Sequence, residues 1–215
     1  MTTLVDRLVA LPTAAVSDAL DALGLPGALH GITPLTDTAR AVGPAFTVRY
    51  EPITGEPGTV GDFLDDVPAG SVVVIDNAGR TDCTVWGGIM TGAATARRIA
   101  GTVVHGVCRD VATAVELGYP MFSAGRFMRT GKDRVRCVAV QQPVRISGVT
   151  IAPDDLITAD ADGAVAVGAQ HLDAVVELAE RIEDTERRIV DAVRTGSTLR
   201  QARTELGYHT LQSRT

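Results

Sequence analysis

Aromatic residues and cysteines are scarce in this chain of 215 residues. The first shortage excludes an aromatic core, and the second excludes a fold held together by cysteines. Aromatic side chains make up only 4% of the sequence, so we expect a core built from Val, Ala, Leu and Ile. The three cysteines, Cys83, Cys108 and Cys137, lack C-x-x-C spacing. Neither a disulfide framework nor a cysteine zinc site is therefore expected, and the thiols should be free in a reducing compartment.

Long apolar runs and basic runs are also missing. No segment is long enough to cross a bilayer, and the N-terminus lacks the pattern of a secretory leader. A formal net charge of −6 without a basic run argues against a nucleic-acid-binding surface. The sequence thus predicts a soluble, cytoplasmic protein without membrane or nucleic-acid partners. Its 45% apolar and 21% charged residues suit one domain over residues 1–215, with a polar, flexible tail at about 197–215.

Several catalytic motifs are absent. No G-x-G-x-x-G follows a predicted strand, and neither a G-x-x-x-x-G-K-[ST] loop nor a G-x-S-x-G elbow occurs. The four histidines, His30, His105, His171 and His209, are not paired at metal-binding spacing, and His105 is expected to be a satisfied core or interface residue. The only lysine, Lys132, lies in a polar turn, so a Schiff-base mechanism is not expected.

A glycine pair stands at the start of a predicted helix over residues 89–98. Gly87 and Gly88 carry no Cβ, so a ligand can approach their backbone closely. The first turn of the helix has free N–H groups, and an anion is their natural ligand. The predicted substrate-binding backbone therefore comprises Gly87, Gly88, Ile89 and Met90.

Arg109 and Asp110 follow the next predicted strand, over residues 102–107, which is short, β-branched and apolar like a buried parallel strand. In α/β proteins the carboxyl ends of such strands carry the ligands. Arg109 offers a planar charged fork to a carboxylate or enolate oxygen, and Asp110 offers a hard oxygen ligand to Mg²⁺ or Mn²⁺. An aspartate that opens a helix can also be a simple N-cap, but the nearby glycine pair favours a binding site.

The segments before this stretch alternate between helix and strand. Thr13 is predicted to be the N-cap of a helix that ends near Gly24, and a strand is predicted over 42–49. A short helix over 60–67 should lead into a buried strand over 72–75, which the turn sequence at 76–79 should end. The loop over 77–85 is then expected beside the same cavity.

The segments after Asp110 change from α/β to mostly β. A short helix to Gly118 and a strand over 120–122 should complete a βαβ-like step, and residues 134–167 should form antiparallel strands. Asp160 and Asp162 are assigned to a hairpin turn rather than to a metal site. The longest helix is predicted over 170–195. Glu186, near its apolar stripe, is either an ordinary exposed glutamate or a carboxylate aimed into a site, including a neighbouring subunit's.

Three segments together resemble a known family. They are WGGIMTGAATARRIAGTVVHGVCRD at 86–110, VVVIDNAG at 72–79 and GVTIAPDDLITADADGAVAV at 148–167. In this order they are similar to the RraA-like family, which includes 4-hydroxy-4-methyl-2-oxoglutarate aldolases, regulators of ribonuclease E activity and so-called dimethylmenaquinone methyltransferases. The resemblance extends over about residues 13–200. It implies an α/β fold with mixed β/β/α layers, like a swivelling domain, assembled as a homotrimer or a dimer of trimers.

The resemblance also implies a chemistry. The chain would be a divalent-metal-dependent lyase that cleaves a 4-hydroxy-2-oxo acid to pyruvate or decarboxylates oxaloacetate. Asp110 would bind Mg²⁺ or Mn²⁺, and Arg109 would stabilise the enolate. Glu186 would be an outer ligand that reaches a neighbouring protomer's metal site through water. The alternative is a non-catalytic, protein-binding regulator of the ribonuclease E inhibitor type.

One position departs from the active aldolases of this family. They carry an acidic residue 21 positions before the arginine of the Arg-Asp pair, where it helps to hold the hydrated metal, and here that position is Gly88. Loss of such an outer carboxylate is expected to weaken metal binding by roughly 10- to 100-fold. Asp82 is the candidate replacement, although the sequence does not place it at the site.

Overall fold

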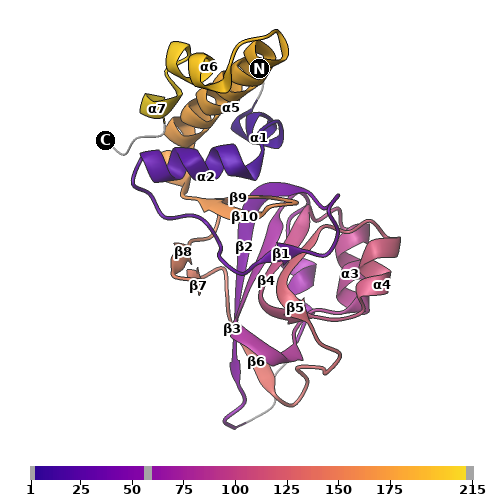
Figure 1. The fold of residues 1–215 in the computed structure, drawn as a ribbon. Helices are drawn as coiled ribbons and strands as arrows, with labels where there is room; N and C mark the ends of the chain where they lie inside the picture. Colours follow the sequence, from indigo (N-terminus) through magenta and orange to yellow (C-terminus); the bar gives the residue numbers. More distant parts are fainter. Residues whose placement is uncertain (1–2, 56–59, 212–215) are drawn as a thin grey trace.

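The computed structural model describes residues 3–55 and 60–211 and has a mixed sheet at its centre (Figure 1). Within these residues the sheet has eight strands, in the order β1-β5-β4-β3-β2-β9-β10, with β6 pairing on β2. The strands are β1 Thr33–Pro34, β2 Ala41–Pro52, β3 Val72–Thr84, β4 Gly101–Cys108, β5 Met121–Arg126, β6 Val135–Val140, β9 Leu156–Asp160 and β10 Gly163–Val167. The predicted mixed α/β fold is confirmed.

The middle of the sheet is parallel. Strand β3 pairs with β2 on one side and with β4 on the other, and β4 pairs with β5, all in parallel. The β-branched runs at 72–75 and 102–104 are fully buried. Both faces of these strands are covered, so buried residues occupy consecutive positions instead of alternating with exposed polar residues. The crossover helices α3 Gly88–Ala96 and α4 Val111–Glu116 lie beside each other at one flank of the sheet (Figure 1). The N-terminus of α3 and the carboxyl end of β4 therefore meet.

The C-terminal strands are antiparallel, as predicted. Strands β9 and β10 form a hairpin, and β7 Val144–Ile146 and β8 Val149–Ile151 form a second, two-stranded sheet that packs on the face of the central sheet opposite α3. Asp160 has a structural role at the hairpin. Its carboxylate accepts hydrogen bonds from the backbone and hydroxyl of Thr13 and from the Asp162 N–H.

A helical layer covers the β9–β10 hairpin (Figure 1). It consists of α1 Leu4–Val9, α2 Thr13–Ala22 and the long helix α5 Leu172–Arg194, with α6 Leu199–Glu205 and α7 Tyr208–Leu211 packed against α5. The predicted polar tail thus contains two helices among its described residues. A capping box between Thr198 and Gln201 starts α6, and Ala202 is buried beneath it. No described helix has the length and hydrophobicity of a membrane span.

Three local predictions in the N-terminal half differ from the structure. Thr13 is the first residue of α2 rather than its N-cap, because Pro12 takes the cap position and the Thr13 side chain bonds Asp160 instead. The turn at 76–79 does not end β3, which continues to Thr84. Left-handed Ala78 and Gly79 kink the chain there, and pairing with β4 resumes beyond the kink at Arg80. The predicted helix at 60–67 is a 3₁₀ turn over Asp62–Asp66.

Glu186 on α5 is half-buried within its own chain. Partial burial raises the pKa of the Glu186 carboxyl, and the carboxylates of Asp18 on α2 and Glu183 add to this rise. The positive charge of Arg203 on α6 and a hydrogen bond with Tyr208 on α7 oppose the rise. Glu186 therefore lies where α2, α6 and α7 meet α5.

We predict that Glu186→Gln stabilises the protein at neutral pH. The folded state holds the Glu186 proton more tightly than the unfolded chain, so the ionised carboxylate destabilises the fold, and the unfolding free energy falls as pH rises through its titration. At pH 7 the variant should gain up to about 0.5 kcal/mol, and the gain should vanish below about pH 4. Urea unfolding at both pH values measures it, with exposed Glu205→Gln as control. A loss of stability at pH 7 would contradict this account.

Candidate functional site

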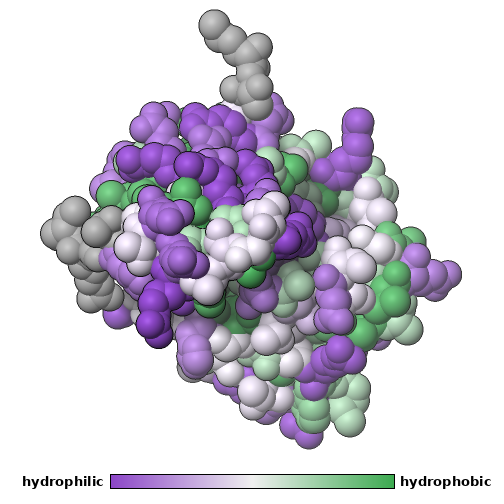
Figure 2. Space-filling view, turned by 45° about the horizontal axis from the view of Figure 1, so that its top comes forward, coloured by the Kyte–Doolittle hydropathy of each residue, from purple (hydrophilic) through white to green (hydrophobic). Residues whose placement is uncertain are grey.

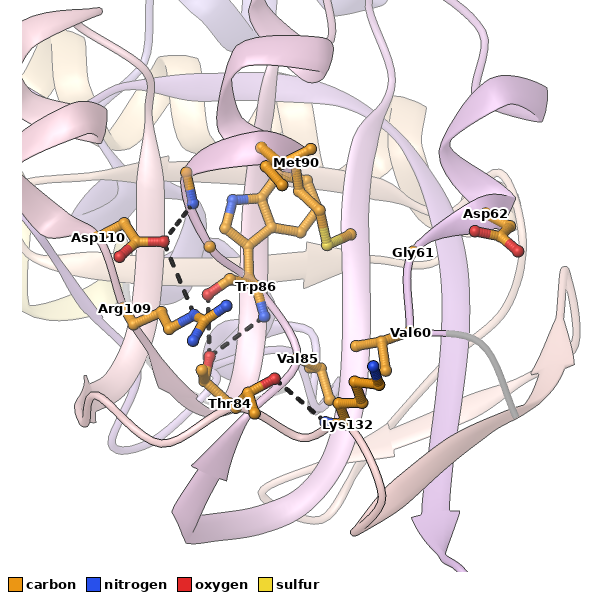
Figure 3. Close-up of a pocket in the computed structure, with 14 residues that line it drawn as sticks. Val60, Gly61, Asp62, Thr84, Val85, Trp86, Met90, Arg109, Asp110 and Lys132 are labelled. Atoms are coloured by element: carbon orange, nitrogen blue, oxygen red, sulfur yellow. Dashed lines mark hydrogen bonds and ion pairs between the residues drawn. The ribbon is translucent and has the colours of Figure 1, made fainter. Parts of the chain in front are cut away.

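A cavity of about 480 Å³ lies where β3 and β4 end and α3 begins (Figure 3). All six residues that the sequence predicts for the binding and catalytic site line this cavity: Gly87, Gly88, Ile89, Met90, Arg109 and Asp110. Trp86 and Val85 form a buried part of the wall, and Val60 and Met90 contribute apolar surface. The cavity is therefore mostly apolar, with a few polar groups, which is the usual composition of a small-molecule site.

The carboxylate of Asp110 binds the backbone at the start of α3. Its Oδ2 accepts a hydrogen bond of 2.7 Å from the Gly88 N–H (Figure 3). Asp110 stands at the N-cap position of α4, yet its side chain does not cap that helix. Its backbone is left-handed, with φ 54° and ψ 41°, a conformation that costs a non-glycine residue about 1–3 kcal/mol. Asp110 is thus held in a strained conformation with its carboxylate directed into the cavity.

Gly87 permits this approach through its missing side chain rather than through its backbone angles. Its φ is −149°, which any residue can adopt. A Cβ at Gly87, however, would lie 2.8 Å from Asp110 Oδ2 and 3.0 Å from Arg109 Nε. Both distances are shorter than an ordinary van der Waals contact. A side chain at position 87 would therefore displace the side chains of Arg109 and Asp110.

Arg109 lies beside Asp110, with its Nε 3.7 Å from Asp110 Oδ2. Its backbone N–H donates to the Trp86 carbonyl at 3.1 Å, which fixes the end of β4 against the glycine turn. The two side chains remain 38% and 47% exposed, so both charges can reach a ligand. Among the described residues, the Arg109 guanidinium has no hydrogen-bond acceptor. It can present its donors to a bound anion.

Buried hydrogen bonds position the glycine turn. The Trp86 indole, which is 1% exposed, donates to the Thr91 hydroxyl at 3.0 Å, and this hydroxyl donates to the Gly87 carbonyl at 3.1 Å. The Trp86 ring stacks on Tyr119 at a centroid distance of 6.1 Å. The Thr84 hydroxyl bonds both the N–H and the carbonyl of Trp86. The turn that presents the α3 N–H groups is therefore rigid.

The rest of the lining comes from two loops and from the 3₁₀ turn. The groups that read the rest of a 2-oxo acid are expected on the loops over 77–85 and 125–132, and Thr84 and Val85 of the first and Thr130 and Lys132 of the second line the cavity. Asp62 of the 3₁₀ turn also lines it and does not follow from the sequence patterns. That Lys132 is the only lysine of the chain is a further sequence signal that singles it out.

Three other candidate residues do not line this cavity. Asp82 forms an ion pair with Arg80 at 2.7 Å, so nothing places it as a replacement for the missing acid at Gly88. His105 bonds Asp76 Oδ1 through Nδ1 at 3.1 Å, as expected for a satisfied histidine. Glu186 belongs to α5, and this helix lies in the helical layer away from α3 (Figure 1). Its role at a neighbouring subunit's site stays a prediction.

The donors around Asp110 fit a hydrated Mg²⁺ or Mn²⁺. Asp110 Oδ2 already accepts a hydrogen bond from the Gly88 N–H, so Oδ1 is the oxygen left for a cation. No group of three or more histidine, cysteine or carboxylate side chains within 3–55 and 60–211 could hold a metal ion. A protein cage for zinc is thus not built here, whereas Mg²⁺ commonly uses one or two carboxylates and completes its shell with water and substrate.

The chain is similar to proteins of one family. Residues 13–166 match the RraA-like family, described as Aldolase/RraA. The chain is 43% identical over 212 residues to Protein DlpA of Legionella pneumophila, covering 97% of this chain but only 34% of that protein, so it spans about a third of that relative's length. It is 34% identical over 189 residues to a Halalkalibacterium halodurans protein provisionally named 4-hydroxy-4-methyl-2-oxoglutarate aldolase, covering 85% of this chain and 87% of that one.

A solved structure shares the fold. Streptomyces coelicolor RraAS2, described as an unusual member of the RNase ES inhibitor RraA protein family, aligns with a TM-score of 0.76 and 30% identity, covering 86% of this chain and 93% of that one. The chain belongs to the RraA-like (Aldolase/RraA) family.

Proposed function

We propose that this cavity is the active site of a divalent-metal-dependent lyase acting on pyruvoyl substrates. The reaction would be aldol cleavage of a 4-hydroxy-2-oxo acid, such as 4-hydroxy-4-methyl-2-oxoglutarate, to pyruvate, with decarboxylation of oxaloacetate as a related activity. The observation that carries the proposal is the convergence of the Asp110 carboxylate, the Arg109 guanidinium and the N-terminus of α3 on one cavity. The aldolase relative supports the same reaction class.

The start of α3 would bind the 2-oxo acid's carboxylate. The first-turn N–H groups of a helix have no partner inside the helix and carry a partial positive charge. The Gly88 N–H donates to Asp110, so the N–H groups of Ile89 and Met90 are left for the substrate. Because the buried bonds of Trp86 and Thr91 fix this turn, little ordering is needed on binding.

Arg109 and Asp110 would act on the 2-oxo group. When the C3–C4 bond breaks, its electron pair moves to C3 and negative charge develops on the 2-oxo oxygen. The Arg109 guanidinium, beside this position, would stabilise that charge through its N–H donors. Asp110 Oδ1 would hold Mg²⁺ or Mn²⁺, and a cation bound there supplies Lewis-acid polarisation of the same oxygen. Decarboxylation asks less of the site, because no base has to remove a 4-hydroxyl proton.

A protein-binding regulator is the second candidate function. Two points favour it: the resemblance implies an acid at position 88 in active aldolases, where this chain has glycine, and RraAS2 shares the fold. We favour the lyase because a regulator needs neither a strained aspartate at a cavity nor free helix N–H groups beside an arginine. The two functions make opposite predictions for turnover, so an activity assay decides between them.

The protein should release pyruvate from 4-hydroxy-4-methyl-2-oxoglutarate or oxaloacetate only when Mg²⁺ or Mn²⁺ is present, and Asp110→Ala should reduce kcat/KM at least about 100-fold. The variant should fold, because Asp110 is half-exposed. A coupled pyruvate assay with and without chelator measures this, with Asp184→Ala, an exposed carboxylate of α5, as control. Metal-dependent release that survives Asp110→Ala would remove Asp110 from the mechanism, and no release at all would favour the regulator.

An acidic residue at position 88 should tighten metal binding. A Cβ at Gly88 would lie 3.3 Å from Asp110 Cβ and 3.4 Å from Asp110 Oδ2, close but tolerable, so Gly88→Asp places a second carboxylate beside the first. We expect Mn²⁺ affinity, measured by electron paramagnetic resonance, to rise about 10-fold. The control is Gly92→Asp on the same helix, where a Cβ meets nothing within 4 Å. Equal affinities in the two variants would contradict Asp110 as the metal ligand.

We propose that the working form is a homotrimer or a dimer of trimers. Large apolar side chains are exposed beside the cavity, where Ile89 is 92% and Met128 76% exposed, and hydrophobic residues also reach the surface on the side of α3 and α4 (Figure 2). Such exposure is typical of protein contacts. The expected contribution of a partner's Glu186 to the metal shell would require such an interface, and it would also require Glu186 to leave its half-buried place between α5, α2, α6 and α7. Light scattering should give at least a trimer, and a monomer at micromolar concentration would contradict the proposal.

A further inference from the structure

Thr84, the last residue of β3, is connected to Arg109 through a single carbonyl oxygen. Thr84 is 2% exposed. Its hydroxyl donates to the Trp86 carbonyl at 2.9 Å and accepts a hydrogen bond from the Trp86 N–H at 3.1 Å (Figure 3). The Trp86 carbonyl also accepts a hydrogen bond from the Arg109 N–H at 3.1 Å. A carbonyl oxygen has two lone pairs, so both bonds can form at once.

The backbone of Thr84 is bonded to the turn after β5 through both of its polar groups. Its N–H donates to the Arg129 carbonyl at 2.9 Å, and its carbonyl accepts from the Gly131 N–H at 2.7 Å. Thr84 and Thr130 form an isolated parallel β-bridge. The turn after β5 and the end of β4 therefore share Thr84 as a common neighbour, although they belong to different strands.

Gly131 can come this close to Thr84 because it has no side chain. A Cβ at Gly131 would lie 2.7 Å from the Thr84 carbonyl oxygen and 2.8 Å from Val135 Cγ2. Val135 is fully buried, and the Thr84 oxygen belongs to the backbone, so neither neighbour has room to move away. The contact between the turn and Thr84 thus depends on a glycine at position 131.

We propose that Thr84 is a positioning residue for Arg109, and that its backbone makes this positioning depend on the turn after β5. The effect on turnover rests on the proposed function, whereas the hydrogen bonds do not. Without the hydroxyl, the buried Trp86 N–H loses its acceptor, so the segment over 84–86 has to shift to find another partner. A shift of the Trp86 carbonyl moves Arg109, because the Arg109 N–H bonds the same oxygen.

Thr84→Val keeps the shape of the side chain and removes the hydroxyl. We expect kcat to fall about 10- to 100-fold, because a displaced Arg109 no longer meets the charge that develops in the transition state. KM should change much less. The bonds from Trp86 to Thr91 and from Thr91 to the Gly87 carbonyl remain in the variant, and they hold the start of α3. Thr84→Ser, which keeps a hydroxyl, should recover most of kcat.

Thr47→Val is the matched control. Thr47 is a fully buried residue of β2 outside the cavity, and its hydroxyl donates to the Gln142 carbonyl at 2.8 Å. This variant also loses a buried hydrogen bond, so its resistance to urea should fall about as much as that of Thr84→Val. Its kcat should stay at the wild-type value.

Amide hydrogen exchange, followed by nuclear magnetic resonance, measures the positioning without any turnover. The Arg109 amide should exchange faster in Thr84→Val, because the Trp86 carbonyl that it bonds is no longer fixed. The amide of Val104, fully buried in the middle of β4, serves as the internal reference for global unfolding. Thr47→Val should change both amides together, whereas Thr84→Val should change Arg109 more than Val104.

Gly131→Ala tests the contribution of the turn after β5. The added methyl group should push the turn away from the Thr84 carbonyl, accelerate exchange at Arg109 and lower kcat. If both changes act through Thr84, the double variant Thr84→Val/Gly131→Ala should lose less activity than the product of the two single losses. A loss equal to that product would show that Gly131 acts separately and would overturn the role of the turn.

The role of Thr84 would be overturned if Thr84→Val had the kcat of Thr47→Val, or if Thr84→Ser were impaired as strongly as Thr84→Val. Failure of the proposed function looks different, because the wild type would then release no pyruvate from either substrate. The exchange experiment still decides in that case. Equal changes at Arg109 and Val104 in Thr84→Val would refute the positioning of Arg109 by Thr84.

Discussion

The hydrogen bond from the Gly88 N–H to Asp110 Oδ2 joins the two halves of the candidate site. It connects the start of α3 with the residue after β4, and it requires that Gly87 lack a side chain and that Asp110 adopt a left-handed backbone. The buried bonds of Trp86, Thr84 and the crossover helices hold both partners in place. The sheet and its helices therefore position one carboxylate, one guanidinium and a helix N-terminus around a shared cavity.

The same hydrogen bond lies at the position where this chain has no acidic side chain. An acid at position 88 would place a second carboxylate beside Asp110, whereas glycine offers only its backbone N–H, which donates to Asp110 Oδ2. One protein carboxylate is enough for Mg²⁺ only if water and substrate complete the shell. The proposed lyase would consequently bind its metal weakly in the absence of substrate. Weak metal binding would then follow from the glycine at position 88, where the resemblance to active aldolases implies an acid.

Local patterns in the sequence predicted the parts of the site that depend on short stretches of chain. The apolar strand before Arg109 and the glycine pair before α3 are such stretches, and both lie where expected. The loop over 125–132 is also expected at the site, but which of its residues reach the cavity depends on the bond between Gly131 and the distant Thr84 carbonyl. The course of β3 beyond Asp76 depends likewise on left-handed Ala78, and Thr13 was misassigned because its partner, Asp160, lies in the C-terminal hairpin.

The most direct test of this account is a crystal structure of the protein grown with Mn²⁺ and pyruvate, with anomalous diffraction used to locate the metal. The account predicts a manganese peak within ligand distance of Asp110, about 2.1–2.3 Å. It also predicts that the pyruvate carboxylate lies at the N–H groups of Ile89 and Met90, with the 2-oxo oxygen between the metal and Arg109. A manganese ion bound elsewhere, or a cavity that takes up neither ligand at millimolar concentrations, would contradict the proposal that this is a pyruvoyl lyase.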